Sequence, residues 1–433
     1  SSVPLWPRLS SLWLSMHTAL PLDATLSQQG PAGKDIVGDD AHELLLSVQH
    51  STDNVQLCSA VVGLRSCLVG TNSGDAAPSA LTGAAYALGM RLRLLAMDLS
   101  LDSSGEAASE LLVVLRDLVQ RSPPDLAIAR SMLVDEPRDS ADGMPSLLSG
   151  IMRFMGGGND DGVGDMTFVH ACGFLAVLAS GDQGVCRALR GAGLLELAAG
   201  RLLRATSGRC GVPTVGIRPD EAPLVAPMRE EWPHFAAVAV SLLEVLILEE
   251  EPDTLTGLPV ILRSIWEPGG QPRQAQIVPD ALLAALDRSL VRQGGSLVVQ
   301  QMHVGALRSL GQLVRICRNQ VFLSSGAHKA LSWNVEPAAQ HLLRADAPAL
   351  AARVLALAGG TDECGTAVAL WFLAELSEGA PTERGLRVGE HLRAVGAAEA
   401  AARARSSYPS SEAVQRQAER VSAACERKRL DLL

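Results

Sequence analysis

The sequence predicts an all-α protein, and two observations lead to this prediction. Hydrophobic residues make up 47% of the 433 residues, but only 3% of the residues are aromatic. The core must therefore consist mainly of Leu, Ala and Val. Leu and Ala favour helices, whereas β-sandwiches and barrels draw on aromatic and β-branched residues. Apolar residues also recur at helical spacing along much of the chain, which supports the same fold class.

Residues 1–40 are expected to form an N-terminal tail and linker. This segment ends in QQGPAGKDIVGDD, whose Gly, Pro and Asp residues are typical of turns and loops. Because the sequence does not begin with Met, we expect a fragment or a processed form.

Residues 41–156 are expected to form N-terminal helical repeats. The segment AHELLLSVQH places Leu44, Leu45 and Val48 on one helical face. The segments ASELLVVLRDLVQR and GMPSLLSGIMRFM have the same amphipathic spacing further along the chain.

The segment NVQLCSAVVGLRSCL predicts another helix within these repeats. Asp53 precedes it and is a suitable N-cap residue, because its side chain can accept a hydrogen bond from the first turn. The residues predicted to form the buried face are Val55, Cys58, Val62 and Leu68.

The rest of the chain alternates between helical segments and breaks. A Gly/Asp loop is expected at 157–165, followed by further helical repeats over 166–405. Two inserted loops rich in Pro and Gly are expected within this region, near 206–232 and 267–279. A charged amphipathic helix over 406–433 is expected to cap the C-terminal end.

The segment VHACGFLAVLASGDQGVCRALRGAGLLELAAGRLL contains a helix, a polar turn, a short helix, a glycine break and another helix. This order resembles the armadillo repeat and the related HEAT class, and Gly191 and Gly193 fall at the helix-breaking glycines of that family. The order returns in the segments that begin VVQQMHVGALRSL and GTAVALWFLAEL. The resemblance covers about two thirds of the chain and implies an α-solenoid, a right-handed superhelix with irregular repeats.

Leu175, Leu243, Leu310 and Leu373 fall at the third-helix position of these repeats, 63 to 68 residues apart. One armadillo or HEAT repeat spans about 40–47 residues. Each interval must therefore hold either one repeat and an insertion or one and a half degenerate repeats.

The net charge of −10 and the pI near 5.4 argue against nucleic acid as a partner. No apolar run is long enough for a membrane span. The eight cysteines include no CxxC pair, so we expect the cytoplasm or another reducing intracellular compartment.

The sequence offers no recognisable catalytic centre. The stretch GGGNDDGVGD lacks the GK[ST] ending of a phosphate-binding loop and the alternating acids of an EF-hand. HExxH and GxSxG motifs are also missing, and the histidines His170 and His303 stand in apolar segments. We therefore expect a protein that is not an enzyme, without a cofactor or a bound metal.

The armadillo resemblance implies a concave groove lined by third helices, which holds extended peptides or partner helices. Trp371 with Glu375 comes nearest to the W-x-x-x-N pairs of importin-like members, but the other repeats lack the Asn, so importin-like cargo binding is not expected. Arg308 and Arg65 occupy similar places in ALRSL and GLRSC and are further candidates for the groove. Core packing of Trp371 and solvated positions for both arginines remain alternatives.

The resulting hypothesis is a non-enzymatic scaffold or adaptor that binds basic or helical protein segments. The acidic run Glu249–Glu251 is a candidate docking site for a basic partner, with a solvated helix end as the alternative. A structural subunit of a large multiprotein assembly is the second hypothesis. A regulator of Hsp70 nucleotide exchange is a third, which the armadillo resemblance permits but no residue supports.

Overall fold

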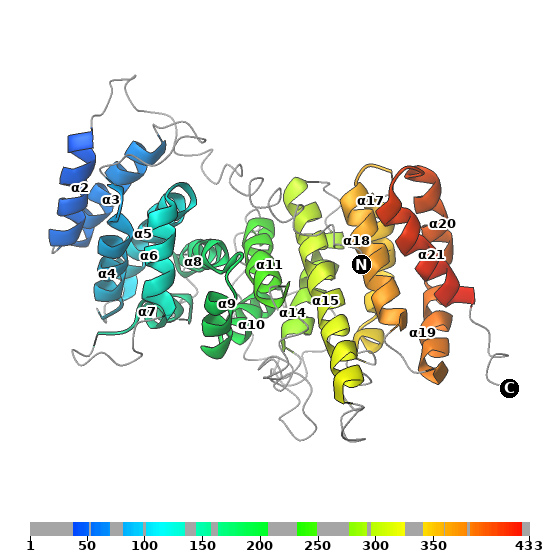
Figure 1. Ribbon diagram of the computed structural model, residues 1–433. Coiled ribbons are helices and arrows are strands. Elements are labelled where there is room, and N and C mark those ends of the chain that lie inside the picture. The colour runs from blue at the N-terminus through cyan, green and yellow to red at the C-terminus, as the bar shows by residue number, and fades with distance from the viewer. Residues whose placement is uncertain are drawn as a thin grey trace.

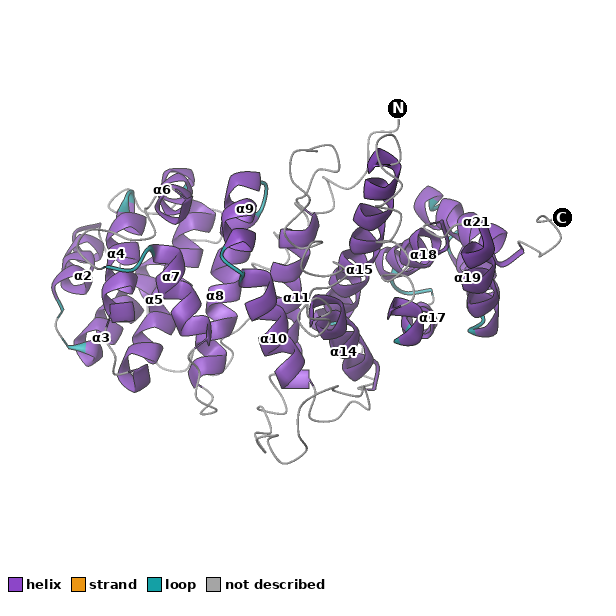
Figure 2. Ribbon diagram, turned by 90° about the horizontal axis from the view of Figure 1, so that it is seen from below, coloured by secondary structure: helices purple, strands orange, loops and turns teal. Residues whose placement is uncertain are grey.

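The structure is a computed structural model, and twelve ranges of the chain are described. They are 38–51, 53–69, 81–97, 101–134, 144–156, 163–206, 232–248, 277–291, 296–324, 341–358, 360–378 and 382–426. Helices dominate these ranges, and no β-strand occurs within them (Figure 2). The predicted all-α class is confirmed for this part of the protein.

Most of the described helices form two rows that run side by side along the molecule (Figure 1). Each helix of the first row packs against the next one in that row. The first row consists of α3 (Asn54–Val69), α5 (Leu101–Arg121), α8 (Val163–Ala179), α11 (Trp232–Leu248), α15 (Leu297–Ser324), α18 (Glu363–Glu378) and α21 (Glu412–Glu426).

The second row packs against the first and has the same internal order. It consists of α2 (Gly38–His50), α4 (Ala84–Met97), α7 (Leu147–Gly156), α10 (Leu194–Thr206), α14 (Ile277–Val291), α17 (Ala347–Ala358) and α20 (Ala397–Ser407). Because neighbouring helices alternate between the rows along the chain, the apolar face of each helix is buried by its neighbours in both rows.

Three described helices of 9 to 13 residues belong to neither row and contact both, and we call them the short helices: α6 (Pro123–Val134), α9 (Gln183–Gly191) and α19 (Thr382–Ala394). In each case the chain continues from the short helix into a second-row helix and then into a first-row helix. The same succession therefore occurs in α6–α7–α8, α9–α10–α11 and α19–α20–α21.

The leucines that recur in the sequence occupy consecutive helices of the first row. Leu175 lies on α8, Leu243 on α11, Leu310 on α15 and Leu373 on α18, and all four are fully buried. Each interval between them contains one helix of the second row, together with residues outside the described ranges.

Tight turns lead into several second-row helices. Gly83, Gly193 and Gly396 have φ values of 87°, 85° and 73°, and each directly precedes such a helix. Asp346 has φ of 55° directly before α17. Glycine adopts this left-handed conformation without a steric penalty, and Asp tolerates it better than most residues. The glycine break expected at Gly193 is therefore a sharp turn between α9 and α10.

The helix boundaries differ from some of those expected from the sequence. Residues 163–165 and 277–279, which were predicted to belong to loops, are helical because α8 begins at Val163 and α14 at Ile277. A helix tolerates Pro279 there because an N–H in the first turn has no partner within the helix. At the C-terminal end, α21 is limited to residues 412–426 of the predicted 406–433. Residues 38–40 of the predicted tail are likewise helical because α2 begins at Gly38, and the end residues of the predicted 206–232 loop belong to α10 and α11. Residues 1–37 and the remaining parts of the predicted loops lie outside the described residues.

The predicted buried face of α3 was wrong in part. Val55 is 75% exposed and Val62 is 48% exposed. Leu68 is buried as predicted, and the other residues that face the core are Leu57, Val61 and Leu64. Apolar residues occur on more than one face of this helix, so spacing alone could not identify the face that its neighbours cover.

Candidate interaction surface along the first row

The four residues that the sequence predicted for a groove all lie on the first row. Arg65 is on α3, Arg308 on α15, and Trp371 and Glu375 on α18. They do not form one site, because α3 and α15 are separated in the row by α5, α8 and α11. All of them contact neighbouring helices of the row, as the distances below show.

Arg308 forms an ion pair with Glu244 of α11. Its guanidinium nitrogen Nη1 lies 2.8 Å from Oε1 of Glu244, and the two side chains are only 10% and 3% exposed. Burial raises the pKa of the Glu244 carboxyl, and the positive charge of Arg308 partly opposes this rise. Arg308 is therefore a buried contact between α11 and α15, not a solvated surface residue.

Trp371 packs across Gly311 of α15. A Cβ atom at Gly311 would lie 2.8 Å from Cη2 of the indole ring, which is too close for an ordinary contact. The Trp371 residue is only 7% exposed. Its burial supports the core alternative, in which the ring fills the space above a glycine where α15 and α18 approach each other.

Glu375 and Glu378 of α18 both bind Arg420 of α21. The guanidinium of Arg420 donates hydrogen bonds of 3.0 Å to Glu375 and 2.7 Å to Glu378. These bonds, first the one to Glu378, hold the pKa of Arg420 above its ordinary value. Glu375 therefore links α18 to α21.

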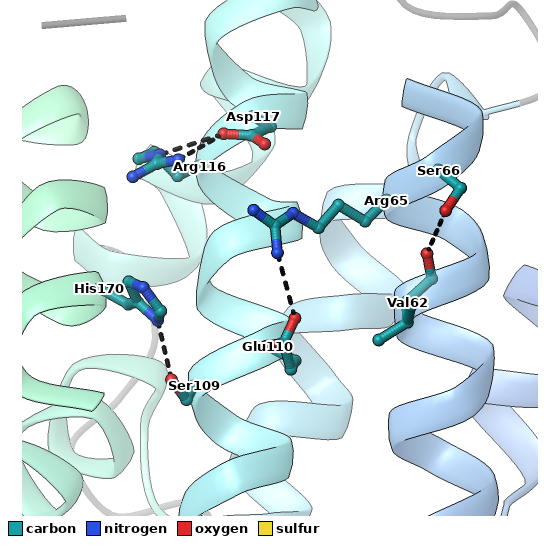
Figure 3. A network of polar contacts seen from close by, with 8 residues as sticks. All are labelled: Val62, Arg65, Ser66, Ser109, Glu110, Arg116, Asp117 and His170. Atoms are coloured by element: carbon teal, nitrogen blue, oxygen red, sulfur yellow. Dashed lines mark hydrogen bonds and ion pairs between the residues drawn. The ribbon is translucent and has the colours of Figure 1, made fainter. Parts of the chain in front are cut away.

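Polar contacts also join the helices at the other end of the row (Figure 3). Arg65 of α3 lies 3.7 Å from Glu110 of α5, and both side chains are about one quarter exposed. Ser109 of α5 and His170 of α8 form a buried hydrogen bond of 2.8 Å. The first row is thus linked by polar side chains at several of its helix contacts.

Sequence reasoning missed the partners in these contacts, above all Glu244 and Arg420. Glu244 stands in the apolar run SLLEVLIL, where a lone carboxylate needs a buried partner. This signal could have marked Glu244, although it would not have identified Arg308. The acidic run Glu249–Glu251 lies outside the described residues.

Other side chains with potential chemistry are enclosed in the core. His303 of α15 forms a 2.7 Å hydrogen bond with Ser289 of α14, and burial lowers its pKa to about 4. Burial strongly raises the pKa of the Cys172 thiol. Within the described ranges no three His, Cys, Asp or Glu side chains gather as metal ligands. None of the described helices is both long and apolar enough to cross a membrane.

No family model and no curated protein matches the chain. Among solved structures, the chain is similar to the crystal structure of an engineered protein from the Northeast Structural Genomics Consortium. The two are 13% identical with a TM-score of 0.38, over 89% of this chain and 96% of that one. A second engineered protein from the same consortium is 15% identical with a TM-score of 0.21, over 90% of this chain and 99% of that one. Neither likeness carries an argument about function, and the armadillo resemblance stays a prediction from the sequence.

Proposed function

We propose that the protein is an armadillo-like α-solenoid and a non-enzymatic scaffold, which binds protein partners along the exposed surface of its first row. The observation that carries this proposal is the repeated succession of short helix, second-row helix and first-row helix in α6–α7–α8, α9–α10–α11 and α19–α20–α21. A unit of this kind buries its apolar surface only by stacking on its neighbours, which is the principle of a solenoid.

An equivalent contact in the three units supports the proposal. An arginine of each short helix donates a hydrogen bond to a carbonyl oxygen in the last turn of the first-row helix of the same unit. The three contacts are Arg130 to Leu178 (2.9 Å), Arg190 to Leu246 (2.8 Å) and Arg393 to Cys425 (2.7 Å). Recurrence of one contact at matching places favours repeats over an irregular helical domain.

A scaffold role agrees with the stiffness that such contacts provide. Polar pairs across α3–α5, α11–α15 and α18–α21 hold successive first-row helices in a fixed register. A rigid row offers side chains at regular spacing along its length, and this suits an extended peptide or a partner helix. The net charge of −10 favours a partner with basic residues.

Crosslinking mass spectrometry in native extract tests this function. The chain has only three lysines but 47 acidic residues, so a crosslinker that reacts with carboxylates is needed. We expect partner crosslinks at exposed first-row acids such as Glu106 and Glu378. Exposed Glu399 on second-row helix α20 is the internal control. Partner crosslinks confined to the second row, or none at all, would contradict the proposal.

Light scattering on the native material separates the scaffold from the alternative of a structural subunit. Exchange between free protein and complexes of several masses is expected of an adaptor. Residence of all the protein in one large complex of fixed mass would favour the structural subunit.

A further inference from the structure

Helix α3 exposes an apolar stripe on the first row. Val55 and Val62 are 75% and 48% exposed, and exposed Ser59 and Ser66 lie on the same side at intervals of three and four residues. The hydroxyl of Ser66 donates a 3.0 Å hydrogen bond to the carbonyl oxygen of Val62, within the same helix (Figure 3). Because this hydroxyl is already bonded, the stripe is less polar than its sequence suggests.

The stripe differs from the positions on the row that the sequence predicted for a groove. Arg308, Trp371 and Glu375 are between 4% and 8% exposed, and their side chains serve helix contacts. Within the described ranges, the first row has one further exposed large hydrophobic residue, Leu297 at the start of α15. The two exposed valines of α3, which lie two turns apart, therefore form a larger accessible apolar surface than the single exposed Leu297.

Carboxylates lie near Cys58 on the same helix as the stripe. Asp53 precedes α3, and Glu106 and Glu110 lie on the adjacent helix α5. All three act on the thiol of Cys58, whose pKa is raised first by burial and then by these negative charges. Residues 38–64 contain four acidic residues and no Lys or Arg. Arg65 is paired with Glu110, so its charge is partly neutralised.

The alternation of Val and Ser fits a helix better than an extended strand. Valines at positions 55 and 62 form a ridge, and the small serines at 59 and 66 leave room for the side chains of a second helix to settle between them. An amphipathic helix can contact such apolar anchors with its own apolar residues at positions i, i+4 and i+7. The negative charges beside the ridge select for basic residues at the margins of that helix.

We propose that the α3–α5 end of the first row is the docking site for an amphipathic partner helix whose apolar face is flanked by Lys or Arg. This inference rests on the proposed scaffold function and adds the place and the chemistry of the partner. Val55 and Val62 supply the apolar contact, and Asp53 and Glu106 supply the charge.

Fluorescence anisotropy with a labelled synthetic peptide tests the inference on the full chain. The probe is an amphipathic helix of about five turns with a Leu face flanked by Lys. Two comparison peptides carry Glu in place of Lys, or the same residues in scrambled order. We expect the Lys peptide to bind more tightly than either comparison peptide, and its affinity to fall as salt is added.

Single substitutions then locate the site. Val62→Asp and Glu106→Lys are each expected to weaken binding of the Lys peptide by about tenfold or more. The matched controls are Leu357→Asp on α17 and Glu390→Lys on α19, which change an exposed apolar and an exposed acidic residue elsewhere. Both controls are expected to bind like the unchanged protein, and circular dichroism confirms that each variant is folded.

Equal binding of the Lys and Glu peptides would overturn the inference, and so would unchanged binding to both folded variants at Val62 and Glu106. The crosslinking experiment separates this failure from that of the function itself. Partner crosslinks at Glu378 but not at Glu106 would leave the scaffold function standing and remove the α3–α5 site. Absence of first-row crosslinks would contradict both.

Discussion

Arg190 of α9 donates a 2.8 Å hydrogen bond to the carbonyl oxygen of Leu246, in the last turn of α11 and 56 residues further along the chain. The arginine is buried, and a carbonyl at the end of a helix has no N–H partner within its own helix. Its positive charge also lies at the negative end of the α11 dipole. One side chain thereby fixes the short helix of a unit to the end of its first-row helix.

Replacing this arginine is expected to destabilise the protein. Arg190→Met keeps much of the apolar stem but leaves a buried carbonyl without its donor, which costs roughly 1–3 kcal/mol. Arg187→Met is the matched control, because Arg187 is exposed and donates its hydrogen bond to the carbonyl oxygen of Gln183 within its own helix. Urea unfolding measures both variants. Equal free energies of unfolding for the two would show that the contact to Leu246 has no role in stability.

Two Gly→Ala substitutions are expected to have opposite effects. At Gly311 the new methyl group would collide with the ring of Trp371, and overpacking of this kind costs about 1–3 kcal/mol. At Gly200 of α10 the methyl group would make an ordinary contact 3.5 Å from Ile277, so the gain in helix propensity, up to about 1 kcal/mol, should prevail. Thermal unfolding shows the sign of each change. A Gly311→Ala protein as stable as the unchanged one would mean that Trp371 moves away without cost.

The buried pair of Glu244 and Arg308 is expected to show strong coupling. Each of Glu244→Leu and Arg308→Met removes one partner of this buried ion pair and should cost about 3–5 kcal/mol, whereas the double variant should lose much less than the sum. A double-mutant cycle by denaturant unfolding measures this coupling. Additive losses would show that the two side chains act independently.

His303 is expected to make stability depend on pH. Its pKa is lowered by burial from 6.5 to about 4. Between these two pH values the unfolded chain therefore binds a proton that the folded chain does not. The free energy of unfolding should therefore fall as the pH drops from about 6.5 towards 4, by roughly 3 kcal/mol in total. His303→Gln should remove this part of the pH dependence.

Ser289→Ala is the control for the same measurement. It removes the hydrogen bond to His303 but leaves the imidazole buried, and burial is the cause of the lowered pKa. The slope of stability against pH should therefore persist in this variant. A slope that is lost with Ser289→Ala but kept with His303→Gln would assign the effect to another group.

Much of the fold could be predicted from local patterns. Helical spacing and the scarcity of aromatic residues predict the all-α class, and the recurring leucines at 175, 243, 310 and 373 mark helices that pack consecutively. The glycine at 193 marks a sharp turn in the same way. Signals of this kind depend on residues only a few positions apart, so they can be recognised without knowledge of the packing.

The candidate surface could not be predicted in the same way. Whether Trp371 lines a groove or fills the core depends on Gly311 of another helix, and the environment of Arg308 depends on Glu244, which is distant in the sequence. The exposed face of α3 was likewise decided by the helices that pack against it, since apolar residues lie on several of its sides. The sequence by itself determined the all-α class, the existence of many of the helices and the recurrence of the buried leucines. The tertiary structure alone decided which side chains are buried between helices and which remain accessible, because burial and charge pairing depend on residues brought together from distant parts of the chain.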